Sequence, residues 1–442
     1  MDPSSLQRAN SAFGLRSRDL SLSPVEVARG LSHLPGLVFL DSSVAENEAF
    51  RRDARFSLVA AEPVERVSGD FFSGADRERL RRALDRYRSG DGPALDLGFP
   101  AGGAIGAIAY DGGFQFGLYP EVLIYDHRRE SWLECGRLSE RLREPGSFSD
   151  SIPAETLSFA TGTSRESFLD SVRRAQEYIA AGDIYQVNLS HRFRALLPNA
   201  TDAQAFSLYE SLRESSPAPF AAFLDLGGGR RVLSSSPELF LEISGNAIRT
   251  RPIKGTRPRF RDPARDEKSA YDLLTSPKEI AELIMITDLE RNDLGQICEY
   301  GSVQATDLLK LERYAQVFHL VSTVEGRLRP GIDHVEALAA CFPGGSITGA
   351  PKKRAREIID ELESEPRGLY TGTIGMFGFD GESRFNIAIR TAIIENDEIH
   401  FHTGAGIVAD SVPEAEYEET LHKAAGILNA CETSPTQWES QA

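Results

Sequence analysis

The sequence has few cysteines, a deficit of positive charge and no long apolar run. Its four cysteines include no CxxC pair, so neither a disulfide framework nor a structural zinc site is expected, and a cytoplasmic location fits this usage. No stretch approaches about 18 uninterrupted apolar residues, which excludes a conventional membrane-spanning helix. The N-terminal segment MDPSSLQRAN lacks the pattern of a signal peptide. With 49 Lys and Arg against 66 Asp and Glu, the net charge of −17 makes nucleic acid and membrane surfaces unexpected partners.

The composition is that of an ordinary soluble globular protein. The 442 residues are 41% hydrophobic and 26% charged, which is enough for one large domain or two moderate ones. A stretch rich in Ser, Thr, Pro and Gly, residues 144–164, predicts a linker or a long surface loop.

Alternating apolar patterns predict antiparallel sheet. A helix is predicted over residues 164–181, with Gly182 as its C-terminal cap. Three predicted β-hairpins pair the segments 231–243 with 247–253, 375–379 with 384–391, and 392–394 with 399–402. Consecutive hairpins with intervening helices indicate an α+β protein rather than a parallel βαβ fold.

The Gly-rich segment 344–349 does not predict a nucleotide site. It begins like a P-loop, but Ala350 and Pro351 follow where Gly-Lys-Ser/Thr is required. Pro351 fits the first turn of a helix. The three basic residues at 352–354 are unfavourable in that turn, and they form either solvated surface or a site for an anion or a partner.

Four glutamates occur in pairs at helical spacing. Glu279 and Glu282 share one face of a predicted helix, and Glu416 and Glu419 repeat the spacing in a second one. Carboxylate oxygens are the ligands of a hard cation such as Mg²⁺. The alternative is that they are ordinary exposed glutamates of helix surfaces.

Both helices begin with a possible capping box. Ser276 with Glu279, and Ser411 with Glu414, have the Ser-x-x-Glu spacing in which the two residues cap the helix reciprocally. Glu279 and Glu414 could therefore serve as caps alone.

Several residues in apolar or Gly-rich segments suggest chemistry but have simpler explanations. Lys254, in PIKGT, is either a solvated charge at a strand edge or a nucleophilic amine. His319, in VFHLVS, fits a buried core histidine as well as a site residue. Arg390, in the alternating segment NIAIRT, would require a carboxylate if it faces inward. The backbone N–H groups of Gly404 and Gly406 could bind an anion.

Nine segments taken together are more specific than any one of them. In chain order they are GDIYQVNLS, SSSPELFL, TRPIKGTRPR, EIAELIMITDLERNDLG, HLVSTVEG, FPGGSITGAPK, IAIRT, GAGIVADS and EAEYEETLHKA. This series resembles the chorismate-utilising family, which includes anthranilate, aminodeoxychorismate, isochorismate and salicylate synthases. The resemblance is strong from residue 165 to about residue 430 and looser before that.

The resemblance implies the fold and its division along the chain. The family fold is a large α+β sandwich of two antiparallel sheets with helical outer layers. We therefore expect an N-terminal region similar to anthranilate synthase component I over residues 1–150, and a chorismate-binding catalytic domain over residues 165–435. Leu40, Asp41 and Ser42 approximate the Leu-Glu-Ser of the family's tryptophan-binding pocket.

The resemblance also implies roles for individual residues. The expected catalytic residues are Lys254, Glu238, which would help the C4 hydroxyl to leave, and His319. The expected metal site is Mg²⁺ bound by Glu282 and Glu419 with support from Glu279 and Glu416, and the metal would bind the ring carboxylate of chorismate. The expected substrate-binding residues are Gly255, Thr256, Tyr370, Arg390, Gly404, Gly406 and Lys423.

Two positions bear on which reaction the family member performs. Isochorismate- and salicylate-forming members have a lysine base where this chain has Gln186, so water addition at C2 is not expected. Lys254 resembles the lysine of members that aminate chorismate at C4 for 4-aminobenzoate and folate synthesis. The alternatives are amination at C2, as in anthranilate synthase component I for tryptophan synthesis, and a homologue without catalytic activity.

No glutaminase motif occurs in the chain. A separate glutamine amidotransferase subunit is therefore the expected source of ammonia.

Overall fold

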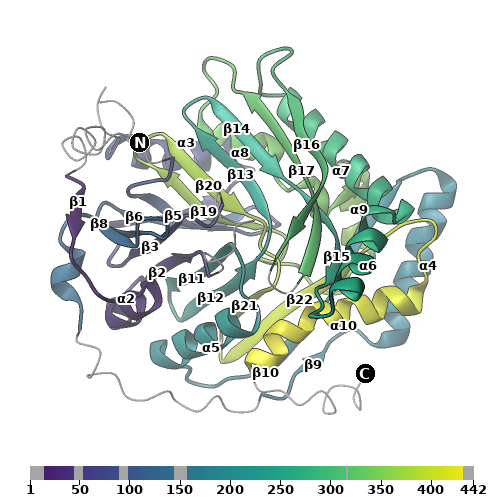
Figure 1. Ribbon diagram of the computed structural model, residues 1–442, viewed down its shortest axis with the longest axis horizontal. Helices are drawn as coiled ribbons and strands as arrows, with labels where there is room; N and C mark the ends of the chain where they lie inside the picture. Colours follow the sequence, from purple (N-terminus) through teal and green to yellow (C-terminus); the bar gives the residue numbers. More distant parts are fainter. Residues whose placement is uncertain (1–13, 44–52, 89–97, 144–156, 315–316, 432–442) are drawn as a thin grey trace.

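The computed structural model describes residues 14–43, 53–88, 98–143, 157–314 and 317–431. Two large antiparallel sheets lie between layers of helices, and this confirms the expected α+β sandwich (Figure 1). None of the helices in these ranges is long and apolar enough to cross a membrane.

The first sheet has twelve strands within the described residues. Their order is β1 (Arg16–Arg18), β8 (Ser131–Cys135), β7 (Val122–Asp126), β3 (Phe56–Ala60), β2 (Val38–Asp41), β11 (Phe220–Gly227), β12 (Arg230–Ser236), β21 (Thr391–Glu395), β22 (Glu398–Ile407), β10 (Gln186–Leu196) and β18 (Gly349–Ala350), with β9 (Ala160–Thr161) also pairing with β10.

The second sheet has ten strands within the residues that the structure describes. Their order is β15 (Ile253–Pro258), β17 (Val317–Arg327), β14 (Ala247–Arg251), β13 (Leu239–Ser244), β20 (Glu382–Asn386), β19 (Thr373–Gly378), β5 (Gly103–Ile108), β6 (Gly113–Tyr119) and β4 (Glu65–Asp70), with β16 (Gln304–Arg313) pairing with the other edge of β17.

Helices cover the outer faces of both sheets. The first sheet shares a hydrophobic core with α2 (Pro24–Leu31), α4 (Arg165–Ala181), α5 (Asp202–Ser215), α9 (Lys352–Leu362) and α10 (Pro413–Ala430). The second sheet packs against α3 (Gly74–Asp85), α6 (Pro263–Leu274), α7 (Pro277–Gly295) and α8 (His334–Cys341). A third core lies between the sheets, where side chains such as Leu58 and Leu224 of the first meet Ile105 and Met376 of the second.

The predicted helix at 164–181 is confirmed as α4. The Ser164 side chain accepts a hydrogen bond from the Ser167 N–H at 3.1 Å, and Gly182 ends the helix with φ of +84°. This left-handed conformation suits glycine because it has no Cβ.

The predicted strand 231–243 is wrong in one respect: it is two strands in different sheets. β12 ends at Ser236 in the first sheet, and β13 begins at Leu239 in the second. Pro237 lies between them, and a proline cannot donate to a strand ladder. The crossing leaves Glu238 at the junction of the two sheets.

A second crossing corrects the predicted strand 384–391. β20 ends at Asn386 in the second sheet and β21 begins at Thr391 in the first, so Arg390 lies outside both strands with φ of +50°. The two crossings are adjacent: the Ser235 N–H donates to the Arg390 carbonyl at 3.0 Å, and the Ile387 N–H donates to the Glu238 carbonyl at 3.1 Å.

Strands from both predicted regions share the two sheets. β2 pairs with β11 in the first sheet, and β5 pairs with β19 in the second. The division of the chain into an N-terminal region, residues 1–150, and a catalytic domain, residues 165–435, stays a prediction from the sequence. The possible linker falls largely on residues 144–156, which lie outside the described ranges.

Candidate active site

The buried acid of the site comes from the first sheet crossing. Glu238 is 5% exposed, and its carboxylate is hydrogen-bonded to the Ser346 side chain and to the Ile253 N–H. Burial raises the pKa of Glu238 to about 7, although Ser346 and the positive charge of Lys254 oppose the change. Glu238 is therefore protonated in a large fraction of molecules near neutral pH, as a proton donor requires.

Arg390 approaches this acid from the second crossing. Burial lowers the pKa of its guanidinium, and the nearby charge of Glu238 opposes the change. Glu238 is thus a carboxylate near enough to act on the charge of Arg390.

Strand β15 carries Lys254, whose amine lies near helix α7 and strand β22. The Lys254 Nζ lies 3.8 Å from Glu282 Oε2, and a Cβ added to Gly406 of β22 would lie 3.5 Å from the same Nζ. Its side chain is 18% exposed, so Lys254 is not a solvated edge charge. The next residue, Gly255, has φ of +75°, and a Cβ there would lie 2.7 Å from the side chain of Leu273. Glycine is required at this position by both conformation and space.

His319 of β17 lies beside the same strand. Its Nδ1 is 2.9 Å from the Thr256 hydroxyl and 3.4 Å from the Gly255 carbonyl oxygen. Burial lowers the pKa of His319 to about 4, and the charge of Arg390 acts in the same direction. The imidazole is therefore neutral at physiological pH.

Helix α7 contributes the first pair of glutamates. Glu282 is 8% exposed, and Glu279 is 3.4 Å from the Arg257 guanidinium. Burial raises the pKa of Glu282, while Lys254 and Lys278 oppose this increase. The Ser276 side chain accepts a hydrogen bond from the Glu279 N–H at 3.5 Å, which confirms Ser276 as the N-cap. The predicted reciprocal capping box is not formed, because the Glu279 carboxylate lies against Arg257 instead of the Ser276 N–H.

Helix α10 contributes the second pair, and each of its glutamates meets a lysine. Glu416 is 3.1 Å from Lys278 Nζ, and Glu419 is 2.7 Å from Lys423 Nζ. Burial alone would raise the pKa of Glu419, but Lys423 and the other lysines lower it.

The capping box predicted at Ser411 and Glu414 is wrong. The N-cap of α10 is Val412, which makes no side-chain cap. Ser411 instead donates to Glu416 Oε1 at 2.7 Å, and Glu414 lies on the surface near Arg173.

The four glutamates are candidates for binding a cation. All four belong to the described residues, in which no three Asp, Glu, His or Cys side chains converge closely enough to share a metal ion. However, Glu282 Oε1 and Glu416 Oε2 are buried without a hydrogen-bond partner. Unpaired buried oxygens are unfavourable, and a divalent cation would satisfy them. The four glutamates therefore fit Mg²⁺ as ligands, provided that their side chains rotate so that the carboxylates point toward a common position.

The remaining predicted binding residues lie along β22. The Lys423 Nζ donates to the Gly404 carbonyl at 2.9 Å. A Cβ on Gly404 would lie 2.8 Å from the Tyr370 hydroxyl, so Tyr370 packs directly against this strand. Burial raises the pKa of Tyr370 to about 12, which keeps the hydroxyl protonated.

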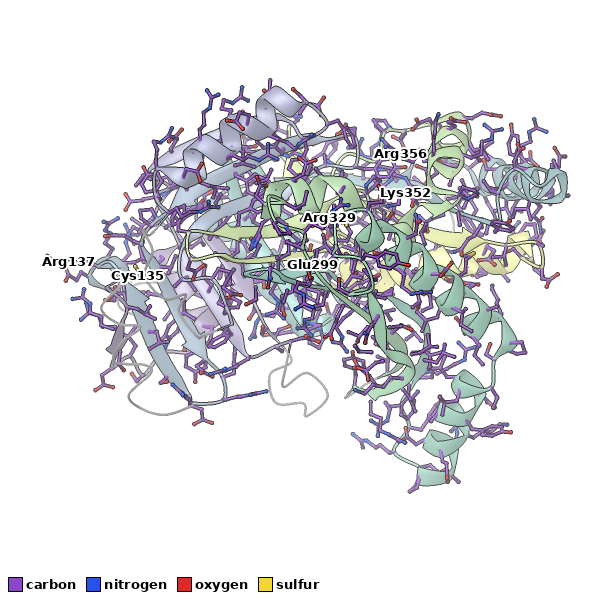
Figure 2. All side chains as sticks on the ribbon, turned by 90° about the horizontal axis from the view of Figure 1, so that it is seen from above. Cys135, Arg137, Glu299, Arg329, Lys352 and Arg356 are labelled. Carbon is purple, nitrogen blue, oxygen red and sulfur yellow. The ribbon has the colours of Figure 1, made fainter. Side chains whose placement is uncertain are left out.

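Sequence reasoning missed several residues of the site. Ser346, whose side chain is hydrogen-bonded to Glu238, lies in the Gly-rich segment 344–349, which gives it no separate role. Lys278, which pairs with Glu416, belongs to no motif. Lys352, labelled in Figure 2, is not free in solvent, because its Nζ is 2.6 Å from the buried Asp293. In each case the partner is distant in the sequence, and no local pattern indicates the contact.

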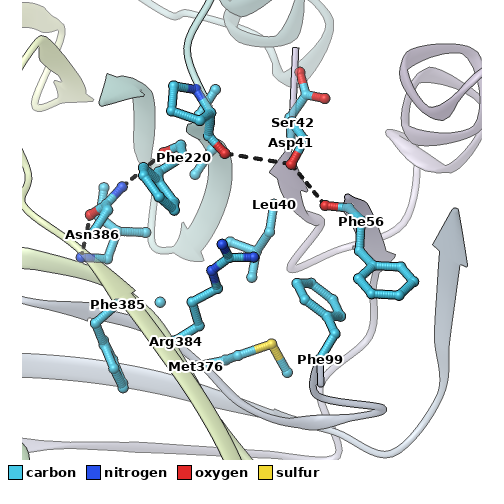
Figure 3. Close-up of a pocket in the computed structure, with 15 residues that line it drawn as sticks. Leu40, Asp41, Ser42, Phe56, Phe99, Phe220, Met376, Arg384, Phe385 and Asn386 are labelled. Carbon is cyan, nitrogen blue, oxygen red and sulfur yellow. Dashed lines mark hydrogen bonds between the residues drawn. The ribbon is translucent and has the colours of Figure 1, made fainter. Parts of the chain in front are cut away.

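A separate cavity of about 40 Å³ lies between the sheets, away from these residues. Figure 3 shows Arg384 extending among Leu40, Phe99 and Phe220. The predicted motif around Leu40 lines this cavity, and its Asp41 carboxylate is 2.6 Å from the Arg213 guanidinium.

Comparisons with known proteins agree with this arrangement. Residues 57–429 match the model of the chorismate binding enzyme family, and the chain belongs to that family. It is 38% identical to anthranilate synthase component 1 of Streptomyces coelicolor, over 93% of this chain and 87% of the relative. It is 39% identical to aminodeoxychorismate synthase component 1 of Escherichia coli, over 91% of this chain and 94% of the relative.

One relative matches over a shorter part of its own length. An anthranilate synthase component 1 of Haloarcula marismortui is 45% identical over 70% of this chain, and the match spans 62% of that relative.

The crystal structure of anthranilate synthase component I from Streptococcus pneumoniae has a TM-score of 0.73 at 30% identity, covering 85% of this chain and 92% of that one. The relatives thus include enzymes named for both reactions.

Proposed function

We propose that this enzyme aminates chorismate at C4, giving 4-amino-4-deoxychorismate, in the cytoplasm. The observation that carries the proposal is the position of Lys254. Its amine lies 3.8 Å from the Glu282 carboxylate and beside Gly406, and its charge acts on Glu238. A nucleophilic amine beside a protonated acid is the pair needed to replace the C4 hydroxyl.

Lys254 and Glu238 would act together in the first step. The neutral amine attacks C2, the two ring double bonds move to C1=C6 and C4=C5, and the C4–O bond breaks. Glu238 gives its proton to the departing hydroxyl, which leaves as water. The product is a secondary ammonium that joins Lys254 to the ring, and Glu238 is left as a carboxylate.

The second step reverses the movement of the double bonds. Ammonia attacks C4, the double bonds return to C1=C2 and C5=C6, and the C2–N bond breaks to release Lys254 as a neutral amine. Glu238 regains a proton from solvent. Mg²⁺ held by Glu282 and Glu419 would bind the ring carboxylate and so fix the ring, while Arg390 and Tyr370 would bind the carboxylate of the enolpyruvyl group.

Amination at C2 is the second candidate, because several relatives are named anthranilate synthase component 1. Mass spectrometry of the product formed from chorismate, Mg²⁺ and ammonium distinguishes the two reactions. We expect 4-amino-4-deoxychorismate, and 4-aminobenzoate once a lyase is added. Fluorescent anthranilate as the main product would contradict the proposal.

The nitrogen source is a further expectation of this function. We propose that a separate glutamine amidotransferase subunit supplies ammonia, so the chain alone should use ammonium but not glutamine. Burial raises the pKa of Cys135 and of Cys298 to about 11, so neither is a ready thiolate for glutaminase chemistry. Glutamine-dependent turnover by the purified chain would contradict this expectation.

A further inference from the structure

His319 is covered on one side by an aromatic ring that the proposed reaction does not use. The ring of Tyr314 lies with its centroid 4.8 Å from that of the imidazole, at an interplanar angle of 70°. Both side chains are buried, at 7% and 5% exposure. An edge-on contact of this kind restricts rotation of the imidazole.

Tyr314 is itself fixed by a chain of buried charged groups. Its hydroxyl donates to Glu312 Oε2 at 2.6 Å, Glu312 pairs with Arg251, and Arg251 pairs with Asp53. The Tyr314 N–H also donates to the Val317 carbonyl at 2.8 Å, next to the start of β17. The ring is therefore held at both ends, by its hydroxyl and by its backbone.

The contacts of His319 determine which of its nitrogen atoms is available. The imidazole is neutral and carries one N–H. The Gly255 carbonyl can only accept a hydrogen bond, so its contact with Nδ1 favours the proton on Nδ1, which can also donate to the Thr256 hydroxyl. The hydrogen bonds of the His319 side chain within the described residues are both made by Nδ1, so the lone pair of Nε2 is available to the substrate.

We propose that Tyr314 is a positioning residue that holds the imidazole of His319 with Nδ1 toward Thr256 and Nε2 toward the bound substrate. Tyr314 acts through His319 and is assigned no contact with the substrate. Its effect on turnover rests on the proposed function, whereas its effect on the orientation and tautomer of His319 does not.

Two variants and a matched control test the proposal. Tyr314→Leu removes the ring, and Tyr314→Phe removes only the hydroxyl. Tyr119→Phe removes another buried hydroxyl, one that donates to the Gly36 carbonyl at 2.8 Å far from the site. The measurements are kcat and KM for chorismate consumption, the melting temperature, and nitrogen-15 NMR of the histidine side chains, with His319→Gln used to assign the signal.

We expect Tyr314→Leu to lower kcat by roughly 10- to 100-fold, because small displacements of a reacting group have effects of this size. KM should change much less, and a second tautomer of His319, protonated on Nε2, should appear. Tyr314→Phe should lower kcat about threefold and show the second tautomer at a lower population, since the ring stays but loses its anchor. Tyr119→Phe should leave the His319 signal and kcat unchanged.

A single Nδ1-protonated tautomer and wild-type kcat in folded Tyr314→Leu would overturn the proposal. If Tyr314→Leu does not fold, the same result in Tyr314→Phe overturns it. Chorismate consumption is measured whichever carbon is aminated, and the NMR signal needs no turnover. Failure of C4 amination is therefore distinguishable from failure of this proposal.

Discussion

Two glutamates on different walls of the candidate site, Glu419 and Glu238, have pKa values that are shifted in opposite directions. On the helical wall, Glu416 of α10 pairs with Lys278, and Glu419 pairs with Lys423. On the wall formed by the sheet crossings, Glu238 is buried and makes its hydrogen bonds to uncharged groups, the Ser346 hydroxyl and a backbone N–H. The lysines lower the pKa of Glu419, whereas burial raises that of Glu238 to about 7.

This difference shows how one residue type can serve two tasks in one site. The lysines around Glu419 lower its pKa, so this carboxylate stays ionised and can bind a cation, whereas burial raises the pKa of Glu282 on the same wall. Burial of Glu238 outweighs the opposing charges of Lys254 and Arg390, so a large fraction of this carboxyl group keeps its proton near neutral pH and can transfer it to a leaving group. Substitutions on one wall at a time can test this difference.

The largest expected effect follows from removing the acidic proton of Glu238, on the wall formed by the sheet crossings. Glu238→Gln preserves size and hydrogen bonding but cannot donate a carboxylic proton. We expect chorismate turnover to fall by about 10³-fold, within the usual range for loss of a general acid. The fall in activity that accompanies deprotonation of Glu238 above about pH 7 should also disappear from the pH profile. A variant with near wild-type kcat would show that the proton comes from elsewhere.

On the helical wall, Glu282→Gln and Glu419→Gln each remove one negative charge from the proposed metal site. We expect at least about a 10²-fold loss of activity at limiting Mg²⁺, as loss of electrostatic anchoring typically causes. Titration calorimetry should show weaker Mg²⁺ binding in both variants.

Glu414→Gln is the matched control on the same helix. Glu414 is about half exposed, and its nearest charged partner is Arg173 at 3.7 Å. The control should retain wild-type activity and Mg²⁺ affinity. Equal Mg²⁺ affinity in Glu282→Gln and Glu414→Gln would remove Glu282 from the metal site.

The smallest expected effect tests what sets the acidity of Glu238. The hydrogen bond from Ser346 lowers the pKa of Glu238, so Ser346→Ala should raise it further. Because the protonated acid is the active form, activity lost above about pH 7 in the wild type should persist to higher pH in the variant. The maximal rate should change less than about tenfold. An unchanged pH profile would mean that Ser346 does not tune this carboxyl group.

The sequence allowed the helical wall to be predicted but not the crossings. Glu279 and Glu282 are brought to one face of α7 by helical periodicity, which is a local property. Glu238 and Arg390 were placed in continuous strands because the apolar alternation continues through both crossings. Pro237 could have indicated the first break, since proline is rare inside central strands. That the two halves enter different sheets depends on tertiary pairing, which the alternation does not contain.

The residues that support the site were missed for a related reason. Ser346 and Tyr314 reach their partners through tertiary contacts or backbone reversals, and neither is part of a motif with an obvious chemical role. His319 is a further residue whose role the sequence alone does not decide. Its segment fits a core histidine and a site histidine equally well, and the structure shows it both buried and in contact with β15.

Peptide mass spectrometry can detect the covalent bond that we propose between Lys254 and the substrate. The enzyme is incubated with chorismate and Mg²⁺ in the absence of ammonia and glutamine, then digested and its peptides sequenced. The account predicts an added mass equal to chorismate minus water on the peptide that contains Lys254. Lys254→Ala should carry no adduct and should lose most C4 amination. No adduct in the wild type, together with full activity of Lys254→Ala, would contradict the account.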